Sequence, residues 1–182
     1  MEKNSQRVIM ISGANRGIGN AIREKLQSEN YLLSLGLRNP GAFRDSMEKH
    51  EIENVHLHEY DARNPESAES WVRSTLEHFG RIDGLVNNAA IATGIGGKTC
   101  EEIDIETWDR VMQVNVRGTW LMTKACLTGL RRSGNGKVIN VASDTALWGA
   151  PRLLHYVSSK GAVIAMTRSL ARELGGDGGP AI

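Results

Sequence analysis

The segment that decides the fold is Arg7-Val8-Ile9-Met10-Ile11-Ser12-Gly13-Ala14-Asn15-Arg16-Gly17-Ile18-Gly19, in which an apolar run meets a glycine-rich turn. Arg7 to Ser12 is typical of a short buried strand, and Ile18, Ile22 and Leu26 then recur at the spacing of one helix face. Glycines at such a turn allow a sharp reversal, and the N–H groups that begin the helix attract a pyrophosphate. The GxxxGxG spacing lacks the Gly-Lys-Ser/Thr ending of a P-loop, which argues against a nucleoside-triphosphate site. The residues expected to bind a phosphate-containing cofactor here are Gly13, Asn15, Arg16, Gly17, Ile18 and Gly19.

Strand-like and helical segments alternate about five times along the chain. Further strands are expected over Tyr31 to Leu37, 55–59, Leu85 to Asn88 and Lys137 to Ala142, and further helices from Asn64-Pro65, over 105–131 and over Tyr156 to Leu174. Because parallel strands need crossover connections, this alternation predicts a Rossmann-like α/β fold, a doubly wound parallel sheet with helices on both faces. We expect one domain over residues 1–182, with its ligand crevice at the carboxyl ends of the strands.

Composition limits the possible functions. The chain has 182 residues, of which 40% are hydrophobic and 24% charged, and its net charge of +1 gives no electrostatic footprint for nucleic acid or an anionic membrane. Cys100 and Cys126 have no CxxC spacing and no nearby His, so neither a metal site nor a disulfide framework is expected. The apolar run Val8 to Ile11 is too short for a signal peptide or a membrane span. These features predict a cytoplasmic protein without nucleic-acid or membrane partners.

The end of the second expected strand bears on the choice of cofactor. The segment Leu35-Gly36-Leu37-Arg38-Asn39-Pro40 carries no Asp or Glu where NAD sites hold the ribose 2′-hydroxyl. Arg38, together with Arg16 of the glycine turn, would instead attract a 2′-phosphate. The alternative is that both are solvated surface arginines. We expect NADP(H) to be preferred over NAD(H).

A second group of residues indicates acid–base chemistry. Tyr156 and Lys160 are four residues apart and therefore share one face of a helix. An ammonium close to a phenol favours the phenolate, which brings a tyrosine toward the range where acid–base catalysis works. Ser143 follows the fifth expected strand, where a crevice residue is expected, and Asn115 lies within the long helix. The YxxxK pattern is common by itself, so the interpretation depends on these additional positions.

The order and approximate spacing of these motifs resemble those of the short-chain dehydrogenase/reductase family over nearly the whole chain. The matching positions are Ser12 to Gly19, Asp61, Asn87 to Ala90, Asn115, Ser143, Tyr156 and Lys160. The resemblance implies an NADP(H)-dependent oxidoreductase that interconverts a carbonyl and a secondary alcohol of a small molecule by hydride transfer. The alternative is a noncatalytic nucleotide-binding or oligomerising module.

The resemblance also implies a role for each matching residue. Tyr156 would be the general acid/base, Ser143 would hold the reacting oxygen, and Lys160 would bind the nicotinamide ribose and support Tyr156. Asn115 would anchor a water that relays protons through Lys160, and Asp61 would meet the adenine amino group. The implied cofactor-binding set is completed by Ala62, Asn88, Ala89 and Ala90, with contributions from Tyr156 and Lys160.

Two departures from the family pattern lead to further expectations. Ala90 stands where the family has glycine, which is tolerable only if φ stays negative there. After the last helix, Gly175 is expected to cap the helix, and the closing Gly-Gly-Pro-Ala-Ile has no evident structural purpose. The family's sixth strand, Pro-Gly turn, substrate lid and seventh strand are not present. We therefore expect a C-terminally truncated chain whose fifth strand is an exposed apolar edge.

The long helix carries more apolar residues than one face needs. The residues expected to face the sheet are Met112, Val116, Trp120, Leu127 and Leu130, with Val111, Leu121 and Ala125 off that face. The helix is either deeply buried or packed by a second face on another subunit. With the resemblance, we favour a homodimer or homotetramer formed through helices 105–131 and 156–174. Trp148 and His155 are candidates for the substrate pocket, against rim packing for Trp148 and simple exposure for His155.

Overall fold

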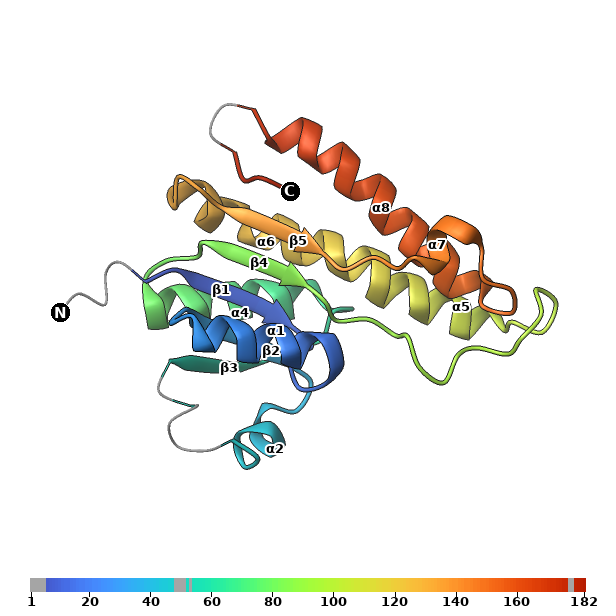
Figure 1. The fold of residues 1–182 in the computed structure, drawn as a ribbon, viewed down its shortest axis with the longest axis horizontal. Helices are drawn as coiled ribbons and strands as arrows, with labels where there is room; N and C mark the ends of the chain where they lie inside the picture. Colours follow the sequence, from blue (N-terminus) through green and yellow to red (C-terminus); the bar gives the residue numbers. More distant parts are fainter. Residues whose placement is uncertain (1–5, 48–51, 53, 177–178) are drawn as a thin grey trace.

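The sheet lies at the centre of the molecule. A computed structural model describes residues 6–47, 52, 54–176 and 179–182. Within these residues, five parallel strands form one sheet in the order β3-β2-β1-β4-β5 (Figure 1). The strands are β1 (Val8–Ser12), β2 (Leu32–Leu37), β3 (Val55–Glu59), β4 (Gly84–Asn87) and β5 (Lys137–Asn140). In the central strand, Ile9 pairs with Leu33 of β2 and with Gly84 of β4. The predicted doubly wound Rossmann-like fold is confirmed.

Helices cover both faces of this sheet. They are α1 (Gly17–Ser28), α2 (Pro40–Arg44), α4 (Pro65–Phe79), α5 (Ile105–Met112), the π-helical turn η1 (Gln113–Arg117), α6 (Gly118–Arg132), α7 (Thr145–Trp148) and α8 (Leu154–Leu174). One apolar cluster joins Trp71 of α4 and Met122 of α6 to Leu85 of β4. A second joins Leu35 of β2 to Ile22 of α1. Burial on both faces explains why β1, β2 and β4 read as nearly continuous apolar runs, whereas the edge strands β3 and β5 are only partly buried.

Local sequence sets the ends of α4. The Oδ1 atom of Asn64 accepts hydrogen bonds from the N–H groups of Glu66 and Ser67 at 2.9 and 3.4 Å, and Pro65 occupies the first turn. Gly80 ends the helix in the left-handed conformation, with φ of 78°. The predicted start at Asn64-Pro65 is confirmed, and it fixes the loop that leaves β3 at the carboxyl edge of the sheet.

The predicted buried face of the long helix was wrong in part. The helix runs without a break through α5, η1 and α6, as expected, and Leu130 is buried. Trp120, however, is 44% exposed, whereas Val111 and Met122 are fully buried. The buried side includes many small and polar residues, among them Asn115, Gly118, Thr119, Thr123, Cys126 and Gly129.

Close approach of this helix to the segments that follow β3 and precede β4 explains the difference. A Cβ on Gly118 would lie 2.8 Å from the carbonyl oxygen of Ala62, and a Cβ on Gly129 would lie 3.1 Å from Ile82 Cδ1. Large side chains do not fit between backbones that lie this close. Predicting the buried face from the largest apolar residues therefore selected positions one residue too far along the chain, such as Trp120 instead of Thr119.

Residues 179–182 lie against the edge strand β5. The N–H of Val138 donates to the carbonyl oxygen of Ala181 at 2.8 Å, and the N–H of Ala181 donates to that of Gly136 at 2.9 Å. The expectation that this segment has no structural purpose was wrong, because it pairs with the start of an edge strand. Ile139 of β5 is nevertheless 57% exposed.

Candidate active site

The carboxyl ends of the strands meet along one edge of the sheet. The strand order reverses between β1 and β4, because β2 and β3 lie on one side of β1 whereas β4 and β5 lie on the other. Along this edge the glycine turn follows β1, Arg38 follows β2, Asp61 follows β3, Asn88 follows β4 and Ser143 follows β5. A point of reversal at the carboxyl ends is where open α/β sheets bind ligands.

The glycine turn after β1 has the backbone that its sequence predicts. Gly13 and Gly17 adopt positive φ values of 69° and 55°, which favour glycine. A Cβ on Gly19 would lie 2.4 Å from both Asn88 Nδ2 and the carbonyl oxygen of Gly13, so glycine is required there for packing. Nothing lies within 4 Å of a Cβ built on Gly17, and Ile18 is 63% exposed instead of packing on the core with Ile22.

Ser12 and Asn88 tie this turn to the end of β4. The side-chain amide of Asn88 donates to the carbonyl oxygens of Ser12 and Gly13 at 3.0 and 2.9 Å. The Ser12 hydroxyl in turn accepts from the backbone N–H groups of Asn88 and Ala89, each at 3.0 Å. Among the described residues, positive φ outside glycine occurs at Asn30 and Arg152, so Ala90 keeps the negative φ that its methyl group requires.

These features fit a pyrophosphate-containing cofactor. The N–H groups that begin α1 follow an open turn with no side chain over Gly17. Asn15 and Arg16 are exposed at the same turn. Helix N-termini of this kind favour negative charge. The turn therefore fits the dinucleotide that its sequence predicts.

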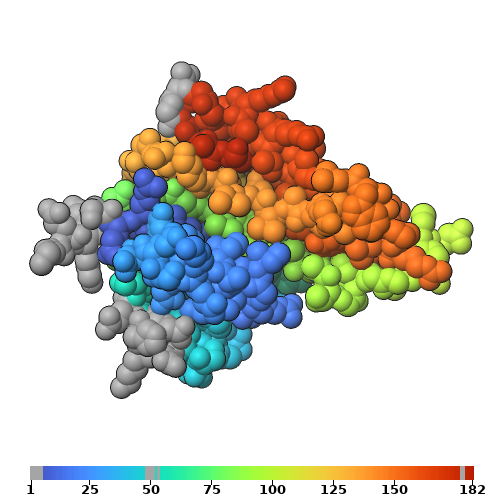
Figure 2. Space-filling model, in the orientation of Figure 1, coloured from blue at the N-terminus to red at the C-terminus, as the bar shows by residue number. Residues whose placement is uncertain are grey.

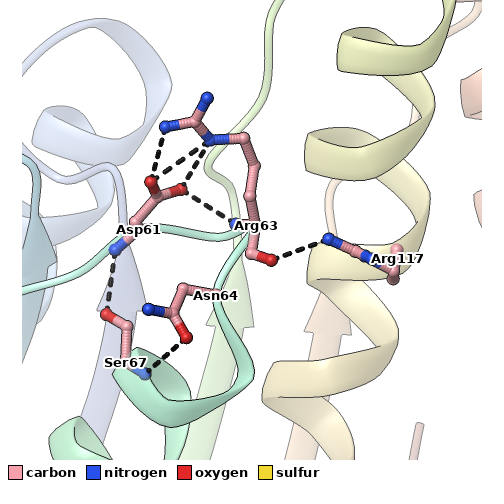
Figure 3. A network of polar contacts seen from close by, with 5 residues as sticks. All are labelled: Asp61, Arg63, Asn64, Ser67 and Arg117. Atoms are coloured by element: carbon pink, nitrogen blue, oxygen red, sulfur yellow. Dashed lines mark hydrogen bonds and ion pairs between the residues drawn. The ribbon is translucent and has the colours of Figure 1, made fainter.

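The loop after β3 holds Asp61 in an ion pair with Arg63 (Figure 3). Arg63 Nη2 lies 2.7 Å from Asp61 Oδ2, and Arg63 Nε donates to Oδ1 at 3.0 Å. Hydrogen bonding to Arg63 lowers the pKa of Asp61, and Arg38 adds a smaller electrostatic contribution in the same direction. Ala62 lies between the two partners and contacts Gly118. Sequence reasoning missed Arg63, although its position two residues after Asp61 was a usable signal.

Lys160 and Tyr156 lie on the same side of α8, at the end of β5. Lys160 Nζ is 5.9 Å from the centroid of the Tyr156 ring and donates to the carbonyl oxygen of Val141 at 2.6 Å. Lys160 is only 4% exposed, and this burial lowers its pKa to about 8. Ser143 Oγ lies 2.8 Å from Thr145 Oγ1. The predicted helix face is therefore present, with an ammonium beside the phenol.

Asn115 connects this region to the end of β4 through η1. Its Oδ1 accepts from the N–H of Ile91 at 2.8 Å, and its Nδ2 donates to Ile91 O at 3.1 Å and to Ser159 Oγ at 3.0 Å. The Ser159 hydroxyl donates to the carbonyl oxygen of Tyr156 at 2.7 Å. Sequence reasoning missed Ser159, whose position within Tyr156-Val157-Ser158-Ser159-Lys160 gave no sign of this contact.

The segments before α5 and around α7 gather at one end of the molecule, yellow-green and orange in Figure 2. The N–H of Gly97 donates to the carbonyl oxygen of Arg152 at 3.0 Å, which joins them. Trp148 is 61% exposed on α7, whereas His155 is completely buried, so the interpretation of His155 as simply exposed was wrong. Burial is the main cause that lowers the pKa of His155.

A comparison with protein families decides which family this site represents. The sequence profile of the short chain dehydrogenases matches residues 7–178. The chain belongs to the short-chain dehydrogenase/reductase family.

Relatives of this short-chain dehydrogenase/reductase cover most of the chain. It is 33% identical over 178 residues to the short-chain dehydrogenase/reductase aba4 of Botryotinia fuckeliana (strain B05.10), a match that spans 96% of this chain and 68% of the relative. A 3-ketoacyl-(acyl-carrier-protein) reductase from Brucella melitensis, complexed with NADH, superposes with a TM-score of 0.86 at 28% identity, over 96% of this chain and 71% of that one. An alcohol dehydrogenase from Thermococcus sibiricus, complexed with 5-hydroxy-NADP, gives a TM-score of 0.85 at 32% identity, over 93% and 72%.

In the described part of this short-chain dehydrogenase/reductase, His, Cys, Asp and Glu side chains do not form a group of three or more that could hold a metal ion. Its helices include none with the length and apolar character needed to cross a membrane.

Proposed function

We propose that this chain carries the cofactor-binding and catalytic part of an NADP(H)-dependent oxidoreductase that interconverts a carbonyl and a secondary alcohol. The observation that carries the proposal is the buried Lys160 beside Tyr156, at the sheet edge that also holds the glycine turn. Burial lowers the pKa of Lys160 to about 8. Such shifts cluster at functional sites.

In this proposal each residue has one task. Tyr156 gives a proton to the substrate oxygen in reduction and takes it back in oxidation. Lys160 places its amino group beside the Tyr156 ring and would bind the ribose of the nicotinamide cofactor. The Ser143 hydroxyl forms a hydrogen bond with the Thr145 hydroxyl in this structure. In the reaction it would donate to the substrate oxygen and hold that oxygen near Tyr156. When bound, the nicotinamide cofactor supplies or accepts the hydride.

Asn115 would support the reaction by holding neighbouring segments in place. Its side-chain oxygen and nitrogen both form hydrogen bonds with protein partners, Ile91 and Ser159. We therefore propose that it fixes α8 relative to the end of β4, in addition to anchoring the relay water that the family resemblance implies. Loss of this contact would move Tyr156, because Ser159 also donates to the Tyr156 carbonyl oxygen.

The preference for NADP(H) over NAD(H) rests on the two arginines. Arg16 and Arg38 are both exposed, next to the turn after β1 and the end of β2. Guanidinium groups bind phosphate through paired N–H donors. The proposed cofactor site comprises the glycine turn with Arg38, Asp61, Ala62, Asn88, Ala89 and Ala90, and reaches Tyr156 and Lys160.

We also propose that the protein forms a homodimer or homotetramer through the long helix and α8. Trp120 and Ile105 expose 44% and 74% of their surface on the long helix, and Leu154 exposes 42% at the start of α8. Exposed large apolar residues favour burial against a second copy. Sedimentation equilibrium gives the mass directly, and a monomer at micromolar concentration would contradict this part of the proposal.

Replacing Tyr156 tests the proposed chemistry. Tyr156→Phe keeps the ring but removes the group that transfers the proton, so turnover of a carbonyl substrate with NADPH should fall by at least about a hundredfold. NADPH binding, followed by fluorescence, should change little. Full activity in this variant would refute the acid/base role. Binding of NADPH by the parent protein without turnover of any carbonyl substrate would favour the noncatalytic nucleotide-binding module instead.

A further inference from the structure

The loop from Asp61 to Ser67 contains a polar network in which Arg63 has no task in the proposed function (Figure 3). We infer that Arg63 is a positioning residue, which holds the Asp61 carboxylate in the orientation that accepts a hydrogen bond from the adenine amino group of the cofactor. The inference rests on the proposed function, because it assumes that a dinucleotide binds at this edge.

The contacts of Arg63 fix the carboxylate in one orientation. Its guanidinium donates to both oxygens of Asp61, from Nε at 3.0 and 3.2 Å and from Nη2 to Oδ2 at 2.7 Å. Its backbone N–H also donates to Asp61 Oδ1 at 2.9 Å. These contacts come from three N–H groups, because Nε is shared between the two oxygens, so a carboxylate with about four acceptor positions keeps one for a further donor. Rotation of the carboxylate, in contrast, would break all of these bonds together.

The loop that carries this pair is itself anchored on three sides. Arg117 Nη2, from η1, donates to the carbonyl oxygen of Arg63 at 2.8 Å. The N–H of Asp61 donates to Ser67 Oγ at 3.0 Å, and the N–H of Asn64 donates to the carbonyl oxygen of Asp61 at 3.0 Å. The position of the Asp61–Arg63 pair is therefore set by β3, by α4 and by the long helix.

Stability alone does not account for this arrangement. The side chains of Asp61 and Arg63 are 42% and 53% exposed, and exposed ion pairs contribute little to folding. The same pair lies at the carboxyl edge of the sheet, close enough to Arg38 for its charge to act on Asp61. A fixed, ionised carboxylate is an acceptor without donors. It suits an amino group on a purine ring and opposes a carbonyl oxygen at the same ring position.

The distinction between an amino group and a carbonyl gives a direct test. The probes are NADPH and its deaminated analogue, reduced nicotinamide hypoxanthine dinucleotide phosphate, whose dissociation constants are measured by fluorescence. A hydrogen bond to a charged group implies that the parent protein prefers NADPH by roughly tenfold or more. Arg63→Gln should reduce this preference to roughly threefold or less, mainly by weakening NADPH binding. Arg63→Lys retains the positive charge but loses the planar pair of N–H donors, so it should give an intermediate preference.

Matched variants separate positioning from a general change of charge. Arg132→Gln removes one exposed arginine at the far end of α6 and should leave the preference unchanged. In an Asp61→Asn background, Arg63→Gln should have no further effect on the preference, because Arg63 acts through the carboxylate. Thermal unfolding of each variant shows whether the fold is intact.

Three outcomes would overturn the inference. Unchanged affinities for both nucleotides in Arg63→Gln would show that Arg63 does not position Asp61. Equal weakening of both nucleotides would show that Arg63 contacts the phosphate itself. A parent protein that binds both nucleotides equally would show that Asp61 does not recognise the amino group. A parent protein that binds neither nucleotide would refute the proposed function, and that result is distinguishable from the other three.

Discussion

The glycine turn and the catalytic segment lie at the same edge of the sheet but are built in different ways. The turn, residues 12–19, is shaped by backbone conformation and by the absence of side chains, as at Gly17 and Gly19. The segment from Ser143 to Lys160 depends on side chains that are held by residues far away in the sequence. Asn115, for example, reaches Ser159 across 44 positions. The first region therefore tolerates few additions, whereas the second is sensitive to the loss of contacts.

The two regions also differ in their effect on the stability of the fold. The glycine turn satisfies its backbone groups through Ser12 and Asn88 and contains no buried charge. The catalytic segment buries the Lys160 ammonium, which disfavours the charged form. Residues that serve function against stability are expected at such sites.

Adding one methyl group to the glycine turn should have the largest effect. In Gly19→Ala the new Cβ would lie 2.4 Å from Asn88 Nδ2 and from the carbonyl oxygen of Gly13, which is part of the backbone. We expect a loss of about 3 kcal/mol in the free energy of unfolding, at the upper end for overpacking, together with loss of NADPH binding. Urea denaturation and fluorescence titration measure the two effects.

A matched control for this change lies in α8, directly after the catalytic segment. Nothing lies within 4 Å of a Cβ built on Gly161, which belongs to α8. Gly161→Ala should therefore stabilise the protein by up to about 1 kcal/mol, because alanine favours the helix. If Gly19→Ala were as harmless as Gly161→Ala, the proposed packing requirement of the glycine turn would be wrong.

The buried ammonium should produce the next largest effect, visible as a pH dependence of stability. Burial lowers the pKa of Lys160 from 10.5 to about 8, so the unfolded chain binds more protons than the folded protein between these pH values. Stability from this group therefore increases as the pH rises from about 8 to 10.5 and is lost as the pH falls through 8. Relative to Lys160→Met, the free energy of unfolding of the parent should rise by roughly 2 kcal/mol over this window. Urea denaturation in matched buffers measures the difference, and a flat difference would mean that Lys160 carries no such penalty.

The contrast between the two regions also explains how much the sequence could predict. The strand–turn–helix segment was predicted correctly because its requirements are local: apolar residues before the turn, glycines within it and an amphipathic helix after it. The same is true of the Asn64-Pro65 helix start, since its cap bonds span only two and three residues. Tyr156 and Lys160 were placed on one face because a single helix determines their spacing.

Contacts between distant segments could not be predicted in this way. The buried face of the long helix depends on how closely Gly118 approaches Ala62, which no periodicity of apolar residues reveals. The π-helical turn at Gln113–Arg117, which contains Asn115, has no signal in a helical repeat. The pairing of Ala181 with β5 was likewise missed, because a short stretch rich in glycine and proline resembles a loop until its neighbour is known.

Replacing Ser159 should cause the smallest loss of stability among these changes, and it tests a contact that the sequence did not predict. Its hydroxyl accepts from Asn115 Nδ2 at 3.0 Å and donates to the carbonyl oxygen of Tyr156 at 2.7 Å. Ser159→Ala leaves the Asn115 amide with one partner fewer, so we expect a loss of about 1 kcal/mol in the free energy of unfolding. If this contact positions Tyr156, turnover should fall several-fold while the dissociation constant for NADPH changes little, and Ser159→Thr should recover part of the activity. A stability loss without any change in turnover would restrict Ser159 to packing, and the catalytic segment would then depend less on its distant contacts than the contrast with the glycine turn implies.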